Sequence, residues 1–263
     1  MKSAVSRGVV TASVVVALGL TAACSGGGGD AKGGGDGGSG GAQPSKSAAT
    51  GESSAATKLE AELEKAALAT GDVKKYEVAK EPEKGSEGSA GKATPPVGRV
   101  DPAECRPLSD LLTAAAPPQS KAHVSRTLTS TDVADATTTE VVLLAYGQAD
   151  GDVDGDAEKT MDTLRTATKS KKCATFREGA HRYIGVRPQP APVGGDEAVS
   201  YKLASRAGEF LARDRVSVVR SGSTLIAFRA SNIFDPTART RASDPKVAET
   251  IVDAQLAKLA EAK

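Results

Sequence analysis

The chain has 263 residues, a formal net charge of +1, and 3% aromatic residues with no Trp. This length accommodates one large domain or two small ones. Nucleic-acid binding rests on a strong basic excess or on aromatic side chains that stack on bases, and the composition offers neither. A nucleic-acid partner is therefore not expected, and the near-neutral charge indicates no other partner.

The first 24 residues have the pattern of an export signal. Lys2 and Arg7 give a basic start, residues 9–20 are mostly apolar, and small residues precede Cys24. The apolar run is too short to span a bilayer core, which takes about 20 helical residues, but it suits a cleavable signal peptide. Small residues before a cysteine resemble a lipobox, so we expect residues 1–23 to be removed and Cys24 to be lipidated. The alternative is an ordinary cleavage site with an incidental cysteine.

Residues 24–57 have the composition of a linker. They hold twelve glycines between Gly26 and Gly51 and no aromatic residue. A Gly/Ser-rich stretch of this length is a flexible coil with an end-to-end distance of roughly 30 Å. Residues 58–263 contain all four Tyr and all four Phe, enough for one ordinary core. We expect a single domain that the linker holds off the outer face of the cell membrane.

Two cysteines remain once Cys24 is assigned to lipid. Cys105 and Cys173 are an even pair in an exported chain, which predicts a disulfide. Two buried free thiols are the alternative. A zinc site fits less well, because His123 and His181 lack the short paired spacing that zinc ligands use.

The first half of this domain begins with helical and extended patterns. A capping-box pattern at residues 57–60 and apolar residues at helical spacing predict a short amphipathic helix that ends at Gly71. A strand over residues 72–79 follows it. Residues 80–98 are rich in Glu, Lys, Gly, Ser and Pro and predict a mobile loop. The leucine pattern of residues 107–115 then predicts a short helix.

Six short segments rich in β-branched, aliphatic and aromatic residues predict strands. They are residues 122–128, 140–146, 182–186, 198–203, 215–220 and 225–230. Residues 141–146 are apolar at both alternating sets of positions, which is typical of a central strand covered on both faces. Ser221 and Gly222 join the last two segments and predict a tight hairpin, because glycine adopts the positive φ that such a turn needs.

Two further helices complete the predicted elements. Residues 157–171 carry an apolar stripe that ends just before Cys173. Asp244 and Pro245 predict the N-cap and the first position of a final helix that reaches Ala260. Strands in runs, with helices between and after them, indicate an α+β fold with a mostly antiparallel sheet.

The order of these features resembles the PknH-like extracellular sensor domain family over roughly residues 58–263. The similarity rests on the two cysteines beside helices, the Gly-Asp-Glu-Ala sequence at residues 195–198 and the hairpin at residues 218–222. The family includes the outer domain of a mycobacterial serine/threonine kinase and stand-alone actinobacterial lipoproteins. The resemblance implies a curved antiparallel sheet, helices flanking a cleft, no catalysis and an unidentified ligand. The family's domain has two disulfides, whereas this chain can form one.

The sharpest local pattern is an acidic loop. Asp150, Asp152, Asp154 and Asp156 alternate with other residues, and a glycine occupies position six. Alternating carboxylates with this glycine are typical of an EF-hand-like calcium loop. Position twelve should be a bidentate glutamate but is Met161. The competing interpretation is a solvated acidic loop whose last carboxylates lie at the positive end of the following helix.

A second pattern is an excess of arginines near the end of the chain. Seven lie between residues 206 and 241, and Arg215, Arg220 and Arg229 are the candidates for contact with an anion. Converging guanidinium groups bind carboxylate or phosphate in a bidentate manner. Alternation along a hairpin would instead scatter them over two faces as a solvated surface.

No nucleophile elbow and no phosphate-binding loop occur in the folded part, so neither catalysis nor a cofactor is expected. The sequence predicts a membrane-anchored extracytoplasmic lipoprotein with a sensor-like or ligand-binding domain. Its partners would be the membrane, through the anchor, and an unidentified small ligand or envelope protein. A structural or protein-interaction lipoprotein of the cell envelope is the alternative, followed by an envelope hydrolase. A concave pocket would favour ligand binding, and a flat apolar patch would favour protein interaction.

Overall fold

The structure, a computed structural model, describes part of the chain. The described residues are 48–80, 98–112, 117, 119–132, 134–135, 137–147, 155–237 and 243–262. Residues 45–263 form one compact unit. Cys24 and most of the predicted linker and mobile loop lie outside the described residues. Across the part that is described, no helix is long and apolar enough to cross a membrane.

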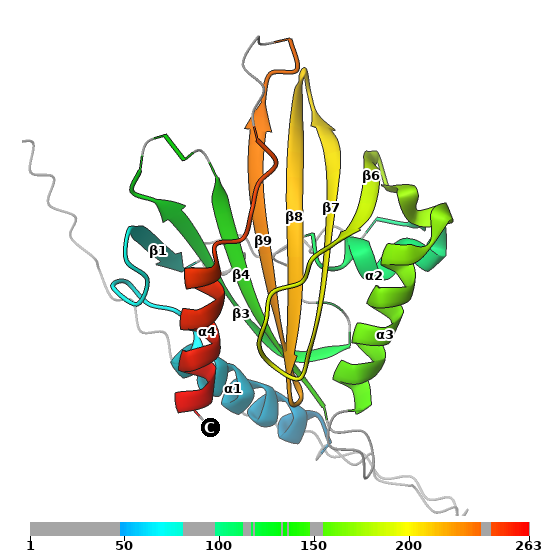
Figure 1. The fold of residues 1–263 in the computed structure, drawn as a ribbon. Coiled ribbons are helices and arrows are strands. Elements are labelled where there is room, and N and C mark those ends of the chain that lie inside the picture. The colour runs from blue at the N-terminus through cyan, green and yellow to red at the C-terminus, as the bar shows by residue number, and fades with distance from the viewer. Residues whose placement is uncertain are drawn as a thin grey trace, which may run out of the picture. The chain divides into compact units, whose positions relative to one another are not determined.

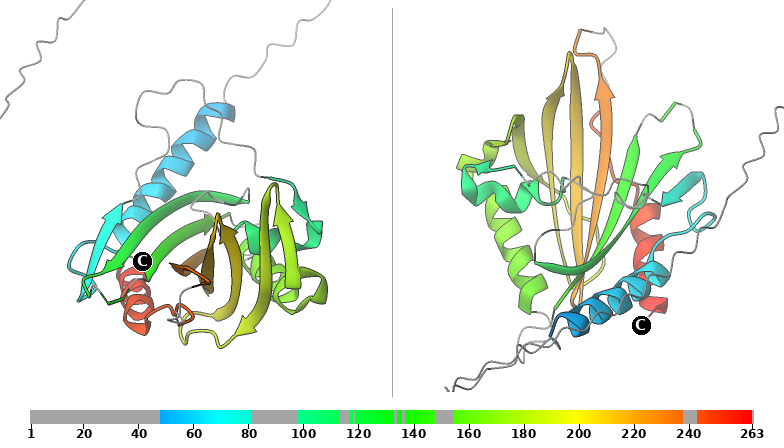
Figure 2. Two further views of the ribbon diagram at one scale, coloured as in Figure 1. Left: turned by 90° about the horizontal axis from the view of Figure 1, so that it is seen from above. Right: turned by 180° about the vertical axis from the view of Figure 1, so that it is seen from behind.

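The described strands form one antiparallel sheet in the order β1-β3-β4-β9-β8-β7-β6-β5-β2 (Figure 1). They are β1 (Tyr76–Lys80), β2 (Val100–Asp101), β3 (Ser120–Ser130), β4 (Thr138–Tyr146), β5 (Thr175–Glu178), β6 (His181–Gln189), β7 (Glu197–Ala207), β8 (Phe210–Ser221) and β9 (Thr224–Phe234). The sheet is curved (Figure 2). The fold is therefore α+β with an antiparallel sheet and flanking helices, as the sequence predicts.

The β8–β9 hairpin turns where the sequence predicts it. Ser221 pairs with Thr224, and Gly222 between them has a φ of 62°. Both strands extend well beyond the predicted segments. Strands β2 and β5 were not predicted, because two and four residues are too short to show alternation.

Four α-helices and two short 3-10 helices flank the sheet within the described residues. They are α1 (Ala48–Ala66), α2 (Arg106–Ser109), α3 (Gly155–Lys169), α4 (Glu249–Glu261), η1 (Ala103–Cys105) and η2 (Lys171–Ala174). Helix α1 begins well before the capping-box pattern at Thr57, in a segment where alanine favours helix. Helix α2 begins and ends earlier than the predicted helix over residues 107–115.

The prediction that Asp244 and Pro245 begin the last helix is wrong. Helix α4 begins at Glu249, and Ala248 is its N-cap residue. The Asp244 carboxylate instead binds Lys202 Nζ at 2.9 Å and Arg213 at 3.2 Å. These ion pairs tie Asp244 to the sheet, and residues 244–248 are not helical.

Two hydrophobic cores lie on opposite faces of the sheet. Strand β4 shows why, because its residues alternate between them. Val142 and Leu144 pack in the first core with α2 and α3, while Val141 and Leu143 pack in the second core with α1 and α4. Figure 2 shows α1 and α4 near the β1–β3–β4 end of the sheet and α3 near its other end. The prediction of a central strand covered on both faces is confirmed.

The second core is closed by a buried glutamine. Gln255 of α4 donates from Nε2 to the Ala66 carbonyl oxygen at 2.6 Å and accepts from the Leu68 amide at 3.3 Å. The last carbonyls of a helix lack partners within the helix. Gln255 therefore supplies the end of α1 with a partner from the other end of the domain.

Candidate functional site

A disulfide joins the elements that frame the candidate site. Cys105 lies in η1, directly before α2, and Cys173 lies in η2, shortly after α3. The two cysteines are bonded, with Cα atoms 5.5 Å apart. Helix α2 is also tied to the sheet, because the buried Tyr201 hydroxyl donates to the Leu108 carbonyl oxygen at 3.1 Å. The start of α2 and the end of α3 are thus held at a fixed separation.

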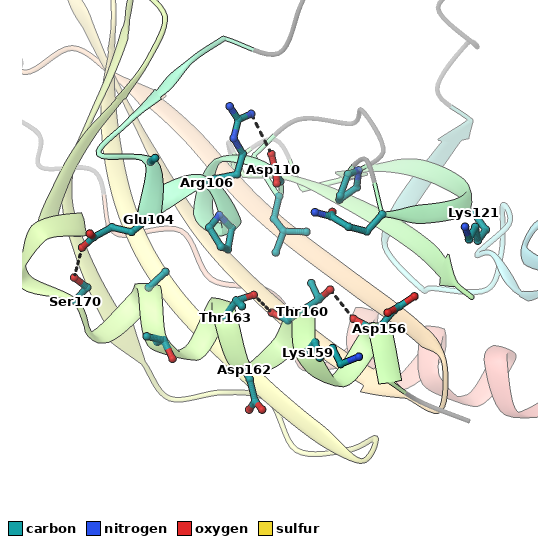
Figure 3. Close-up of a pocket in the computed structure, with 17 residues that line it drawn as sticks. Glu104, Arg106, Asp110, Lys121, Asp156, Lys159, Thr160, Asp162, Thr163 and Ser170 are labelled. Atoms are coloured by element: carbon teal, nitrogen blue, oxygen red, sulfur yellow. Dashed lines mark hydrogen bonds and ion pairs between the residues drawn. The ribbon is translucent and has the colours of Figure 1, made fainter. Parts of the chain in front are cut away.

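A groove of about 980 Å³ opens between α2 and α3 (Figure 3). Its floor and rim combine apolar side chains with hydroxyl, carboxylate and ammonium groups. The lining residues are Ala103, Glu104, Arg106, Pro107, Asp110, Leu111, Pro117, Gln119, Lys121, Asp156, Lys159, Thr160, Asp162, Thr163, Thr166, Ala167 and Ser170. The volume lies in the range of small-molecule sites.

Asp110 is the most perturbed acid in this groove. Its side chain is 10% exposed, and its ion pair with Arg106 is 3.7 Å long. Burial raises the pKa of Asp110 to about 6, Arg106 opposes the rise, and the charge of Glu178 adds to it. Near pH 6 this carboxyl can therefore donate or accept a hydrogen bond from a ligand.

Tyr146 is a buried tyrosine that is not among the lining residues but interacts with Thr160, Asp110 and Asp156, which are. The residue is 3% exposed, and its hydroxyl makes no hydrogen bond of good geometry with the described residues. The nearby Thr160 hydroxyl donates to the Asp156 carbonyl oxygen at 2.8 Å. Burial raises the pKa of Tyr146 to about 12, Thr160 opposes this, and Asp110 and Asp156 add to it. A buried hydroxyl without a partner is rare in folded proteins and calls for a ligand or a water.

The predicted calcium residues lie only partly within the described chain. Asp150, Asp152 and Asp154 lie outside it, whereas Asp156 lies in the first turn of α3 and lines the groove. Among the residues that are described, no group of three or more His, Cys, Asp and Glu side chains could hold a metal ion. The calcium site therefore stays a prediction from the sequence.

The three arginines considered for anion contact do not converge. Arg220 binds Glu197 at 2.7 Å and Arg229 binds Asp214 at 2.9 Å, both on the face of the first core. Arg215 points to the opposite face. It donates to Gln189 at 2.6 Å, to the Pro190 carbonyl oxygen at 2.7 Å and to Ser200 at 2.9 Å.

Sequence reasoning missed Asp110 and Tyr146. A signal was present in each case, because Asp110 interrupts a leucine-rich turn and Tyr146 ends an otherwise apolar strand. Neither signal shows that the two residues lie near each other in the fold. Only the packing of α2 and α3 against the sheet brings Tyr146 close to Asp110 and to the residues that line the groove.

Comparisons with known proteins give matches to solved structures only. No protein-family model matches the chain, and no curated protein matches it either. The extracellular domain of PknH from Mycobacterium tuberculosis is 11% identical, with a TM-score of 0.43, and the match covers 77% of this chain and 94% of that one. An uncharacterized protein from Mycobacterium smegmatis is 12% identical, with a TM-score of 0.37, and the match covers 79% and 92%.

Proposed function

We propose that this protein is an extracytoplasmic, membrane-anchored lipoprotein whose domain binds a small polar molecule in the groove between α2 and α3. The observation that carries the proposal is the buried Tyr146 hydroxyl, which makes no hydrogen bond of good geometry among the described residues and has only the Thr160 hydroxyl near it. A ligand hydroxyl, amide or carboxylate that reaches Tyr146 would remove the cost of burying it alone. The groove volume of about 980 Å³ supports the same assignment.

Ligand binding here is expected to proceed without catalysis. Asp110 and the hydroxyls of Thr160 and Thr163 would orient the ligand, and Leu111 and Pro107 would cover its apolar parts. The disulfide supports binding rather than movement, because it keeps the groove between α2 and α3 pre-formed, and a sensor-like role would depend on recognition of the occupied groove by another molecule. The signal would then pass to a partner in the envelope.

Native mass spectrometry of the protein purified from its own envelope tests this function. Wild type should retain a small molecule, and Tyr146→Phe should retain much less of it. Because the substitution removes an unpaired buried hydroxyl, the variant should be at least as stable as wild type. A loss of ligand without a loss of stability separates a binding role from a structural one.

Tyr183→Phe is the matched control, because it makes the same change at a tyrosine that stacks on Phe176 and interacts with Glu178, Arg229 and Asp214 rather than with residues that line the groove. The proposal fails if wild type carries no small molecule, or if both variants retain it equally. A retained protein instead of a small molecule would favour the second candidate, a protein-interaction lipoprotein. Phe210 and Ile233, which are 41% and 63% exposed, would then be the first residues to substitute.

A further inference from the structure

The face of strands β5 to β8 that points away from the first core carries a cluster of basic side chains. These residues, here called the basic face, are Arg177, Arg182, Arg187, Lys202, Arg206, Arg213 and Arg215. Ile184, Ala204 and Arg213 lie opposite one another in the register and mark its centre. A bulge after Ile184 keeps Arg187 on this face, while Val186 is buried in the first core.

Several of these cations lie directly opposite one another. Arg177 pairs with Arg182 across β5 and β6, and Lys202 pairs with Arg187 on one side and Arg215 on the other. Side chains in such positions are about 5 Å apart at Cβ, and like charges there destabilise a sheet. The fold therefore carries a repulsion that a bound anion would relieve.

The described residues supply little negative charge to the basic face. Asp244 binds Lys202 and Arg213, and Asp101 lies opposite Arg177 at the edge of the sheet. Arg177, Arg182, Arg187 and Arg206 are exposed, and none of them has an ion-pair or hydrogen-bond partner among the described residues. Four guanidinium groups thus remain available to an external partner.

The centre of the basic face holds one exposed aliphatic side chain. The Ile184 side chain is 39% exposed, and Ala204 lies beside it. In Figure 1, α4 lies over the β3–β4 side of the sheet, the segment between β6 and β7 crosses part of β7 and β8, and no described helix lies over these two strands. Four strands spaced about 4.8 Å apart give the basic face a width of about 14 Å. An extended basic surface with an aliphatic centre is suited to a lipid headgroup layer, where cations meet phosphates and an aliphatic side chain enters the interface.

We propose that the basic face docks on a membrane surface rich in anionic phospholipids. The guanidinium groups would bind phosphates in a bidentate manner, and Ile184 would enter the interface between headgroups. This surface is separate from the groove between α2 and α3, since it lies on the other face of the sheet. Docking would hold the domain in one orientation on the bilayer. Without docking, the domain would move freely at the end of its predicted linker.

Vesicle co-sedimentation of residues 45–263 tests the proposal, because this compact unit carries no lipid anchor. Vesicles of phosphatidylglycerol and phosphatidylcholine in equal parts should sediment the protein at low salt, and pure phosphatidylcholine vesicles should not. Each basic residue near an anionic leaflet contributes about fivefold to the binding constant. Arg182→Gln with Arg187→Gln should therefore weaken binding about 25-fold, and these exposed residues should be replaceable without loss of folding.

Lys169→Gln with Lys171→Gln is the matched control, because it removes the same charge from α3 and η2 on the opposite face. An equal loss in the control would mean that only the bulk charge matters and would overturn the proposal. So would equal binding to both kinds of vesicle, or no binding to the anionic ones. If inorganic phosphate at low millimolar concentration saturates the protein and displaces it from vesicles, the basic face is a discrete phosphate site and not a membrane surface.

Discussion

Asp110 and Tyr146 are polar residues whose surroundings do not satisfy them fully. The Tyr146 hydroxyl makes no hydrogen bond of good geometry among the described residues, and Asp110 has one ion pair at 3.7 Å despite its burial. Leaving a buried donor or acceptor unpaired costs about 1 to 3 kcal/mol. Two such groups beside one groove are unfavourable for stability alone, and a ligand that reaches both would recover that cost.

Asp110→Asn should change how stability depends on pH. The pKa of Asp110 is raised from 3.8 to about 6, so the folded protein holds this proton more tightly than the unfolded chain does. The resulting stabilisation is fully present below pH 3.8 and is lost as pH rises through about 6. Asn cannot titrate, so the variant should gain stability relative to wild type across that window.

Melting temperatures of both proteins, measured in steps from acid to neutral pH, check this prediction. Asp253→Asn, on the exposed side of α4, controls for the general loss of one carboxylate. A constant difference between Asp110→Asn and wild type at every pH would show that Asp110 titrates as an ordinary surface carboxyl.

At the level of elements, the disulfide between Cys105 and Cys173 should be the largest single contribution to holding α2 against α3. The bond closes a loop with a sequence separation of 68. In the chain-entropy model a loop of that size stabilises by about 4 kcal/mol. Replacing both cysteines by serine should lower the melting temperature by about 10 °C.

Chemical unfolding of the double serine variant against oxidised wild type gives the free-energy difference directly. Thiol labelling of the unreduced, denatured protein provides an independent check of the bond itself. Two reactive thiols in the denatured wild type would refute the pairing, whatever the stability of the variant.

Elements defined by local sequence patterns could be predicted from the sequence, and elements defined by contacts between distant residues could not. Strand β4 and the β8–β9 hairpin could be predicted because apolar alternation and Gly222 act locally. Strands β2 and β5 are so short that only pairing with each other and with β6 defines them. The start of α4 depends on Asp244 binding Lys202, a contact between distant parts of the chain. The groove could not be predicted from local patterns either, because α2, α3 and the sheet form it together.

For the whole molecule, the proposed lipid anchor at Cys24 has the clearest consequence. Cys24→Ala should release the protein from membranes or leave it unprocessed, because no other residue near the predicted cleavage site can accept the lipid. Membrane fractions should be washed at high salt before comparison, since salt screens charge-mediated docking but does not extract a lipid chain. A wild type without lipid, together with a variant that still fractionates with washed membranes, would rule out the anchor.

The contact between Gln255 and the end of α1 sets the order in which the domain can assemble. Gln255 lies 189 residues from Ala66 and 187 from Leu68, and both contacts belong to the second core. Contacts of such long sequence separation form late and slow folding. While the chain emerges from a ribosome or a translocation channel, α1 has no α4 to pack against and the second core stays open. If the chain is exported as proposed, it would keep its second core open, and would stay threadable through a narrow channel, until α4 has passed.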